Sequence, residues 1–186
     1  MHESAQPGQK DRLHEARLVV LAQAGDRSAL EELLKALQSN LFGYIRHLVG
    51  PDGAEDVLQD VFIEIYRHLR ALDEPLYFRA WVYRISTRGS FRFLRKRKLW
   101  QERHEEDVEM DELPAGSFDS TTVSDELAGW MGTVTPASRA VLLLHYKEDL
   151  SLQEVAAILQ LSAGTVKSRL AYGLKTLRNA MERKTP

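Results

Sequence analysis

The segment from Leu76 to Trp100 combines positive charge with aromatic side chains. It contains eight cationic residues and no acidic one: Arg79, Arg84, Arg88, Arg92, Arg95, Lys96, Arg97 and Lys98. Aromatic residues are interleaved with these cations: Tyr77, Phe78, Trp81, Tyr83, Phe91 and Phe93. Cations neutralise phosphates, and aromatic faces stack on bases that have left a duplex. The pattern is typical of a surface for single-stranded or opening nucleic acid, although a helix with a solvated basic face and a buried aromatic stripe would also produce it.

A second candidate DNA-binding pattern lies near the C-terminus. Ser151 and Glu154 form a capping-box pattern that predicts a short helix, and Ser162 is placed to cap a longer one. A short helix, a tight turn and a longer helix, with the small Ala156 at the crossing, make a helix-turn-helix pattern. The outward face of the longer helix would carry short polar residues for base edges and cations for phosphates: Thr165, Lys167, Ser168, Arg169, Tyr172 and Lys175. A plain packing pair of helices remains the alternative.

The preceding chain predicts further helices that would support these two patterns. Apolar residues recur every three or four positions from about residue 27, and Gly25-Asp26 could end one helix and cap the next. Asp52 and Glu55 resemble a capping box for a helix over residues 54–72. One face of that helix would be an exposed ridge, which is either solvated or a docking surface: Asp56, Gln59, Asp60 and Ile63. The poor helix formers at 86–90 predict a loop or kink inside the basic aromatic segment.

Composition excludes several classes of function. The 186 residues include no cysteine, and the six histidines have no metal-ligand spacing, so we expect no metal and no cofactor. No apolar run reaches the length of a membrane span, and the N-terminus lacks the apolar stretch of a signal peptide. We therefore expect a soluble, cytoplasmic protein without membrane contact.

Charge is distributed unevenly along the chain. The formal net charge is −2, but residues 101–124 contain eight acidic residues and one arginine and so carry −7, which leaves +5 on the rest. Together with the helical patterns, this predicts an all-α protein of two small domains joined by an acidic flexible linker. The predicted segments are a disordered tail (1–9), a four-helix domain (10–100), the linker (101–123) and a helix-turn-helix domain (124–184).

Four stretches, in this order, resemble the extracytoplasmic-function (ECF) group of σ70-type sigma factors. They are GAEDVLQDVFIEIYRHL (53–69), FRAWVYRIS (78–86), FLRKRK (93–98) and SLQEVAAILQLSAGTVKSRL (151–170). The resemblance runs from about Leu18 to Met181. It implies that the first domain is σ2, which binds core RNA polymerase and melts the −10 element, and that the second is σ4, which reads the −35 element.

The resemblance also implies roles for individual residues. It implies that Asp56, Gln59, Asp60 and Ile63 dock on the polymerase core, formed by the β and β′ subunits. It implies contacts to −10 DNA by Trp81, Arg84, Thr87, Arg88, Arg95, Lys96, Arg97 and Lys98. It places −35 reading on Lys167, Ser168, Arg169 and Tyr172, beside Thr165 and Lys175 of the same outward face. The implied partners are core polymerase, promoter DNA and an anti-sigma factor.

Two other functions stay open at this point. A sigma mimic would keep the docking surfaces and sequester an anti-sigma factor without opening DNA. An ordinary helix-turn-helix regulator would bind duplex DNA without polymerase and would leave residues 27–100 as an unexplained partner domain. No nucleophile with a base, no metal spacing and no phosphate loop is visible in the sequence, so we expect no enzyme activity.

Overall fold

Helices build both parts of the chain that this computed structural model describes, residues 7–104 and 129–183. The first part contains four long helices and two 3-10 turns: α1 (Pro7–Gln23), α2 (Arg27–Val49), α3 (Pro51–His68), η1 (Leu69–Ala71), η2 (Pro75–Tyr77) and α4 (Phe78–His104). The second contains α6 (Pro136–Leu142), the π-helical segment η3 (Leu143–Lys147), α7 (Leu152–Leu159) and α8 (Ala163–Glu182). No strand occurs within these two ranges, and the predicted all-α class with two helical domains is confirmed.

Two predicted segments fall largely outside the described residues. The acidic linker assigned to 101–123 is described only over 101–104, which continue α4 as helix. The tail assigned to 1–9 is described only from Pro7, where α1 begins. Among the helices of the described ranges, none has both the length and the apolar character that crossing a membrane requires.

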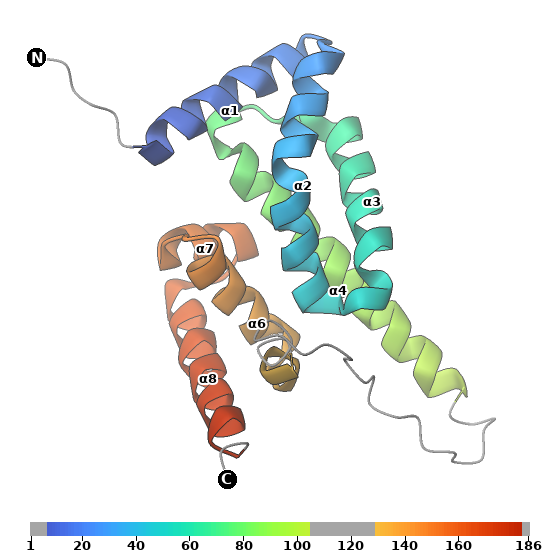
Figure 1. Ribbon diagram of the computed structural model, residues 1–186, viewed down its shortest axis with the longest axis vertical. Coiled ribbons are helices and arrows are strands. Elements are labelled where there is room, and N and C mark those ends of the chain that lie inside the picture. Colours follow the sequence, from blue (N-terminus) through green and yellow to red (C-terminus); the bar gives the residue numbers. More distant parts are fainter. Residues whose placement is uncertain (1–6, 105–128, 184–186) are drawn as a thin grey trace, which may run out of the picture.

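Helix α2 forms the centre of the first domain, with α1, α3 and α4 packed around it (Figure 1). Its predicted apolar stripe is buried, and the largest side chains in it are nearly inaccessible: Leu33, Leu37, Leu41, Tyr44, Ile45 and Leu48. Burying such side chains contributes about 1.5–3 kcal/mol each relative to leaving them exposed. This stripe therefore fixes the frame on which α3 and α4 are held.

The predicted boundary between α1 and α2 is confirmed. Gly25 has φ of +102°, and the Asp26 carboxylate accepts hydrogen bonds from the backbone N–H of Ser28 at 2.9 Å and of Ala29 at 3.2 Å. The capping box predicted at Asp52 is wrong, because α3 begins at Pro51, directly after Gly50, and has no side-chain cap. A proline has its φ preset for the first helical position, so this helix starts ahead of the acidic residue.

The loop predicted at residues 86–90 is also wrong, because α4 runs without interruption from Phe78 to His104. The hydroxyls of Ser86 and Thr87 donate to the carbonyls four residues earlier, at 2.9 and 2.7 Å, and so remain compatible with the helix. Gly89 lies against α3, where an added Cβ would be 3.7 Å from Val57 and from Val61. These small residues therefore allow close packing of α4 on α3 rather than a break.

The second domain packs α6 and α7 against the long helix α8. The predicted caps are confirmed: Ser151 and Glu154 form the capping box of α7, and the Ser162 hydroxyl accepts from the backbone N–H of Thr165 at 3.0 Å to start α8. At the crossing of α6 and α8, a Cβ on Gly173 would come within 2.8 Å of Leu142. The helix-turn-helix geometry predicted from the sequence is therefore formed by α7 and α8.

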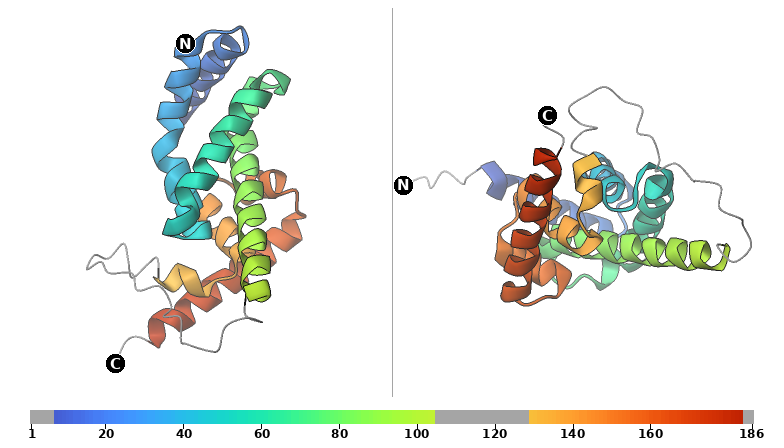
Figure 2. Two further views of the ribbon diagram at one scale, coloured as in Figure 1. Left: turned by 90° about the vertical axis from the view of Figure 1, so that its right-hand side faces the viewer. Right: turned by 90° about the horizontal axis from the view of Figure 1, so that it is seen from below.

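The two domains lie side by side, with α7 against α4 and α6 against α2 (Figures 1 and 2). In Figure 2, seen from below, the C-terminal turns of α4 extend beyond the other helices. The N-terminal half of α4 is thus flanked by the second domain, while its last turns extend beyond α3.

Candidate nucleic-acid interface

Two of the predicted −10 residues pack against neighbours in the first domain: Trp81 in part, and Thr87 completely. The Trp81 ring is partly buried, with its centre 6.2 Å from that of Phe78. Thr87 is only 3% exposed, and its hydroxyl lies 2.7 Å from the hydroxyl of Tyr44, which is fully buried. Burial raises the pKa of the Tyr44 phenol above its usual value, so this phenol stays neutral and can donate. In this arrangement Thr87 supports the core, and its contact with DNA stays a prediction.

Two further predicted −10 residues in the N-terminal half of α4, Arg84 and Arg88, contact the second domain. The Arg84 guanidinium donates to the Ala157 carbonyl at 3.0 Å, and the Arg88 guanidinium donates to the side-chain oxygen of Gln160. Both acceptors belong to the C-terminal end of α7. The structure therefore brings these two arginines together with the helix-turn-helix.

The C-terminal half of α4 carries the remaining predicted −10 cations, and all are exposed: Arg95, Lys96, Arg97 and Lys98. Two of them already have partners within the protein. Arg97 donates to the Val49 carbonyl at 3.0 Å, and its guanidinium lies 5.8 Å from the centre of the Phe93 ring. Lys98 forms a 3.6 Å ion pair with Glu102 one turn later. Arg97 thus anchors the end of α2 in addition to adding positive charge.

The predicted docking ridge on α3 is divided between two grooves. Gln59 and Ile63 line a groove of about 980 Å³ between α2 and α3, whose walls include three aromatic residues: Phe42, Phe62 and Tyr66. Ile63 is 40% exposed and Tyr66 is 69% exposed, so two large apolar side chains of α3 reach solvent beside this groove. An exposed apolar side chain beside a groove of this size favours docking over a merely solvated face.

Asp56 and Asp60 face the other way, into a groove of about 500 Å³ between α3 and α4. Glu64 continues this acidic wall, and the opposite wall carries Arg92 and Lys96. The groove therefore presents negative charge on α3 and positive charge on α4. An anionic strand would be attracted to one wall and repelled by the other, which would restrict how it lies along α4.

Helix α8 presents most of the predicted −35 residues on its open side. Four of them are exposed: Lys167, Ser168, Tyr172 and Lys175. The Ser168 hydroxyl donates to the Gly164 carbonyl at 2.9 Å, and the Thr165 hydroxyl lies 2.8 Å from that of Ser162. Arg169 is half-buried and lines a 90 Å³ cavity shared with Arg84 and Arg88. The open side of α8 thus has the short polar and cationic side chains that suit a DNA groove.

Sequence reasoning missed Arg139 of α6, which joins the two domains. Its guanidinium donates to the His47 carbonyl at 2.9 Å and the Leu48 carbonyl at 3.3 Å, both at the C-terminal end of α2. It also donates within its own domain to the Gly132 carbonyl at 3.0 Å and the Val134 carbonyl at 2.7 Å. Burial lowers the pKa of this guanidinium from its very high usual value. The only signal in the sequence is a cation within the apolar run of α6.

A buried tyrosine provides a second missed contact. The Tyr83 hydroxyl donates to the carboxylate of Glu148, which follows η3 in the second domain. The Tyr83 ring also packs edge-on against Tyr44, with centres 5.3 Å apart. Burial first, and then the hydrogen bond and charge of Glu148, raise the pKa of Tyr83. Its side chain looked like a stacking aromatic in the sequence, but here it joins the two domains.

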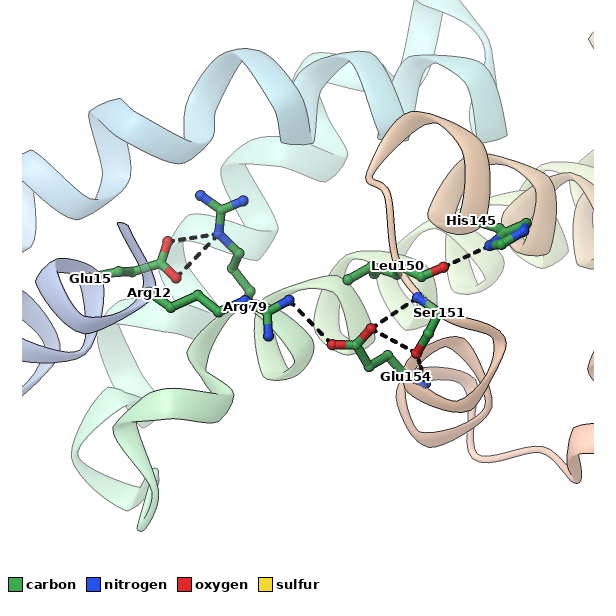
Figure 3. A network of polar contacts seen from close by, with 7 residues as sticks. All are labelled: Arg12, Glu15, Arg79, His145, Leu150, Ser151 and Glu154. Carbon is green, nitrogen blue, oxygen red and sulfur yellow. Dashed lines mark hydrogen bonds and ion pairs between the residues drawn. The ribbon is translucent and has the colours of Figure 1, made fainter. Parts of the chain in front are cut away.

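A polar network extends this junction to α1 (Figure 3). Arg12 forms a 3.3 Å ion pair with Glu154, the capping-box residue of α7, and both side chains are largely exposed. Partial burial acts to raise the Glu154 pKa, but hydrogen bonds from Ser151 and the nearby Arg12 lower it overall. Glu15 holds Arg79 at 3.1 Å, and its pKa is raised because desolvation outweighs that arginine. The Arg12–Glu154 pair reaches α7, but an exposed ion pair of this kind contributes little to stability.

Comparison with known families identifies both domains. Residues 33–99 match the family model described as sigma-70 region 2, and residues 130–179 match sigma-70, region 4. An RNA polymerase sigma-E factor of Streptomyces avermitilis is 31% identical over 163 residues, covering 85% of this chain and 88% of that protein. The ECF RNA polymerase sigma factor SigW of Bacillus subtilis is 27% identical, covering 84% of this chain and 91% of that protein.

Solved structures show the same fold. CnrH in complex with the cytosolic domain of CnrY matches with a TM-score of 0.68 at 24% identity, covering 92% of this chain and 99% of that one. The sigma factor RpoE of Bartonella quintana, in complex with the anti-sigma factor NepR, matches with a TM-score of 0.69 at 17% identity, covering 83% and 97%. Both likenesses extend over the two domains described above.

Proposed function

The chain belongs to the ECF group of σ70-family RNA polymerase sigma factors, and we propose that it directs the core enzyme to a specific set of promoters. The observation that carries this proposal is the presence of two DNA-binding patterns on two helical units of one chain. Helix α4 combines cations with aromatic residues, and α8 is the second helix of a helix-turn-helix. A protein that reads two separated elements and opens one of them needs both.

Each domain has a distinct task in this proposal. The σ2 unit, residues 10–100, docks on the β and β′ subunits of the core through the ridge of α3: Asp56, Gln59, Asp60 and Ile63. The σ4 unit, residues 124–184, places α8 in the major groove of the −35 element, where short side chains approach base edges and cations hold phosphates. The acidic segment 101–123 links the two units.

Strand opening at the −10 element is assigned to α4. Its cations follow the backbone of the non-template strand, since single-stranded DNA keeps its phosphate charge, and Trp81 lies near the bases that leave the stack. The carboxylates on the α3 wall repel phosphates, so the strand is kept toward the α4 side of the groove. The protein contributes binding energy to opening and carries out no bond chemistry of its own.

Regulation by an anti-sigma factor is part of the proposal. The two structural neighbours are both described in complex with a second protein, and for RpoE that protein is named as an anti-sigma factor. The groove between α2 and α3, with its exposed Ile63, offers an apolar surface for such a partner as well as for core polymerase. We propose a cytoplasmic location, where core polymerase and promoter DNA are found.

Transcription with purified core polymerase on sheared genomic DNA tests this function. With the protein added, sequencing of RNA 5′ ends should reveal new starts that share upstream sequences spaced like −35 and −10 elements. Arg95→Ala should weaken promoter binding and reduce its salt dependence, whereas Arg17→Ala on the exposed side of α1 should not. Tight core binding without any new start would instead favour a sigma mimic, and duplex binding without core binding would favour an ordinary regulator.

A further inference from the structure

A small cavity at the contact between the two domains is lined by three arginines and by no acidic residue. Its volume is 90 Å³, and the three cations that line it are Arg84 and Arg88 of α4 and Arg169 of α8. The other lining residues are four apolar side chains, a threonine and a glutamine. The lining therefore carries a formal charge of +3 with no carboxylate to offset it.

The hydrogen-bond acceptors beside the cavity do not neutralise this charge. The Arg84 guanidinium donates to the Ala157 carbonyl at 3.0 Å, and the Arg88 guanidinium donates to the side-chain oxygen of Gln160. Both acceptors are uncharged. In the described part of the chain, neither of these arginines nor Arg169 forms an ion pair. Like charges around one small space repel each other, and apolar walls screen this repulsion poorly, so an anion between them would be stabilised.

One donor on the cavity wall has no acceptor in the described structure. The Nε of Arg84 is buried and makes no hydrogen bond, although another nitrogen of the same guanidinium donates to Ala157. A buried donor without an acceptor keeps its full desolvation cost. A guanidinium has five N–H donors in a planar fork that matches two oxygens of an oxyanion. Arg84 therefore has donor capacity that an oxyanion in the adjoining cavity would satisfy.

The volume of the cavity limits which anion it can enclose. A water molecule takes up about 30 Å³ in the liquid, so 90 Å³ corresponds to about three waters or to one compact oxyanion. A nucleotide is too large for this space. A tetrahedral ion directs its oxygens in several directions, which suits donors that arrive from two helices, α4 and α8. Chloride has the charge but lacks the paired oxygens that a guanidinium fork binds.

We propose that this cavity binds a small tetrahedral oxyanion, such as inorganic phosphate, through Arg84, Arg88 and Arg169. The inference goes beyond the proposed function, because it concerns a free anion, whereas the proposed function assigns the same arginines to DNA. A ligand that contacts both domains in their packed arrangement stabilises that arrangement. Phosphate should therefore strengthen the contact between the domains saturably, in addition to the general effect of salt on stability.

Calorimetric titration of the full chain with sodium phosphate, at an ionic strength held constant with sodium chloride, tests this site. Arg169→Gln removes one guanidinium from the cavity and should weaken phosphate binding about 10-fold or more. Two control variants remove the same charge at exposed positions outside the cavity: Arg178→Gln on α8 and Arg17→Gln on α1. Both controls should bind phosphate as the wild type does. Urea unfolding in chloride checks that each variant is folded.

A second cavity variant, Arg88→Gln, should show the same loss, so the test does not depend on the folding of a single protein. Absence of saturable binding to the wild type would overturn the proposal. Equal binding by the cavity variants and the wild type would also overturn it, since phosphate would then act as an adventitious ion only.

A competition experiment separates free phosphate from the phosphate of a nucleic-acid strand. A thymidine dinucleotide carries its phosphate between two nucleosides, which the 90 Å³ cavity cannot enclose, so it should not displace inorganic phosphate. Displacement at similar concentrations would show that the arginines accept a phosphate at an open surface, and would overturn the enclosed site. No step of this test needs polymerase or a promoter, so its outcome is independent of whether the protein directs transcription.

Discussion

Helices α4 and α8 carry similar cationic residues but are presented to solvent in different ways. On α8, Lys167, Tyr172 and Lys175 are exposed, and the polar contacts of Ser168 remain within its own helix. On α4, two of the eight predicted residues are packed into the protein and two contact α7: Trp81 and Thr87, and Arg84 and Arg88. Most of the predicted −35 face of α8 is therefore open, with Arg169 turned toward the junction, whereas half of the predicted −10 face of α4 is covered.

Under the proposed function, this difference is expected from what each helix reads. A major-groove helix recognises base edges of an intact duplex, so it can remain open without further consequence. A helix that binds separated bases needs aromatic residues and cations together, and these same groups pack well against another protein surface. Under the proposed function, the helix assigned to strand opening is therefore the one whose binding groups also pack against the second domain.

Replacing the buried hydroxyl of Thr87 is expected to have the largest effect on the free energy of unfolding. Thr87→Val leaves the fully buried Tyr44 hydroxyl without its 2.7 Å partner, which should cost about 1–3 kcal/mol of unfolding free energy. Ser168→Ala removes a hydroxyl from the exposed face of α8 and should change stability by less than about 0.5 kcal/mol. Urea unfolding followed by tryptophan fluorescence measures both. A neutral Thr87→Val that abolishes strand opening would instead place Thr87 directly on DNA.

Two glycines at helix crossings provide a second matched comparison. A Cβ on Gly53 of α3 would overlap the Phe93 ring of α4, so Gly53→Ala should destabilise the protein by about 1–2 kcal/mol. A Cβ on Gly173 of α8 would lie 2.8 Å from Cδ1 of Leu142, 3.2 Å from its Cγ and 3.5 Å from the Cβ of Ser138, and the better helix propensity of alanine offsets these milder contacts. Gly173→Ala should therefore remain within about 0.5 kcal/mol in the same unfolding assay. Equal losses of unfolding free energy in Gly53→Ala and Gly173→Ala would contradict this difference in packing.

The salt dependence of DNA binding should differ between the exposed cations of α8 and the covered arginines of α4. Lys167→Ala should reduce the slope of log affinity against log salt by about 0.9 on a duplex −35 element, because the Lys167 side chain is exposed already. Arg88→Ala should reduce the slope for a single strand by about 0.7 once core polymerase is bound, and by less in the free chain. An equal Arg88 effect in both states would contradict the covered arrangement.

A change of pH is expected to have a smaller effect on the contact between the two domains. Burial first, and then the positive charges of Lys147, Arg46 and Arg139, lower the pKa of His47 from its usual 6.5. Because Lys147 and Arg139 belong to the second domain, separating the two domains raises this pKa, so protonation of His47 below about pH 6.5 weakens the packing between them. The expected change is less than about 1 kcal/mol between pH 7.5 and 5.5. Energy transfer between fluorophores on cysteines introduced at the exposed Glu31 and Asn179 measures this change, and His47→Gln should abolish it.

Local patterns allowed much of the fold to be predicted. The caps at Asp26, Ser151 and Ser162 and the apolar stripe of α2 were all correct, since each depends on residues close together in the chain. The errors came where tertiary packing outweighs propensity. The run at residues 86–90 remains helical because its hydroxyls bond back within α4 and Gly89 fits against α3.

The junction between the domains could not be predicted from sequence patterns. Arg139 lies 92 positions along the chain from its partner His47, and Glu148 lies 65 positions from its partner Tyr83. No periodicity or cap connects positions so far apart. The same limit applies to Arg84 and Arg88, whose basic character was evident but whose engagement by α7 depends on how two independent helical units pack.

Permanganate reactivity of unpaired thymines tests the central claim most directly. At a promoter found by 5′-end mapping, core polymerase with the wild-type protein should make −10 thymines reactive, and core polymerase alone should not. The double variant Arg84→Ala, Arg88→Ala should bind core polymerase normally and leave those thymines largely unreactive, because strand binding by α4 is lost. Reactive thymines in the double variant at wild-type levels, or none in the wild type despite tight core binding, would contradict the assignment of strand opening to α4.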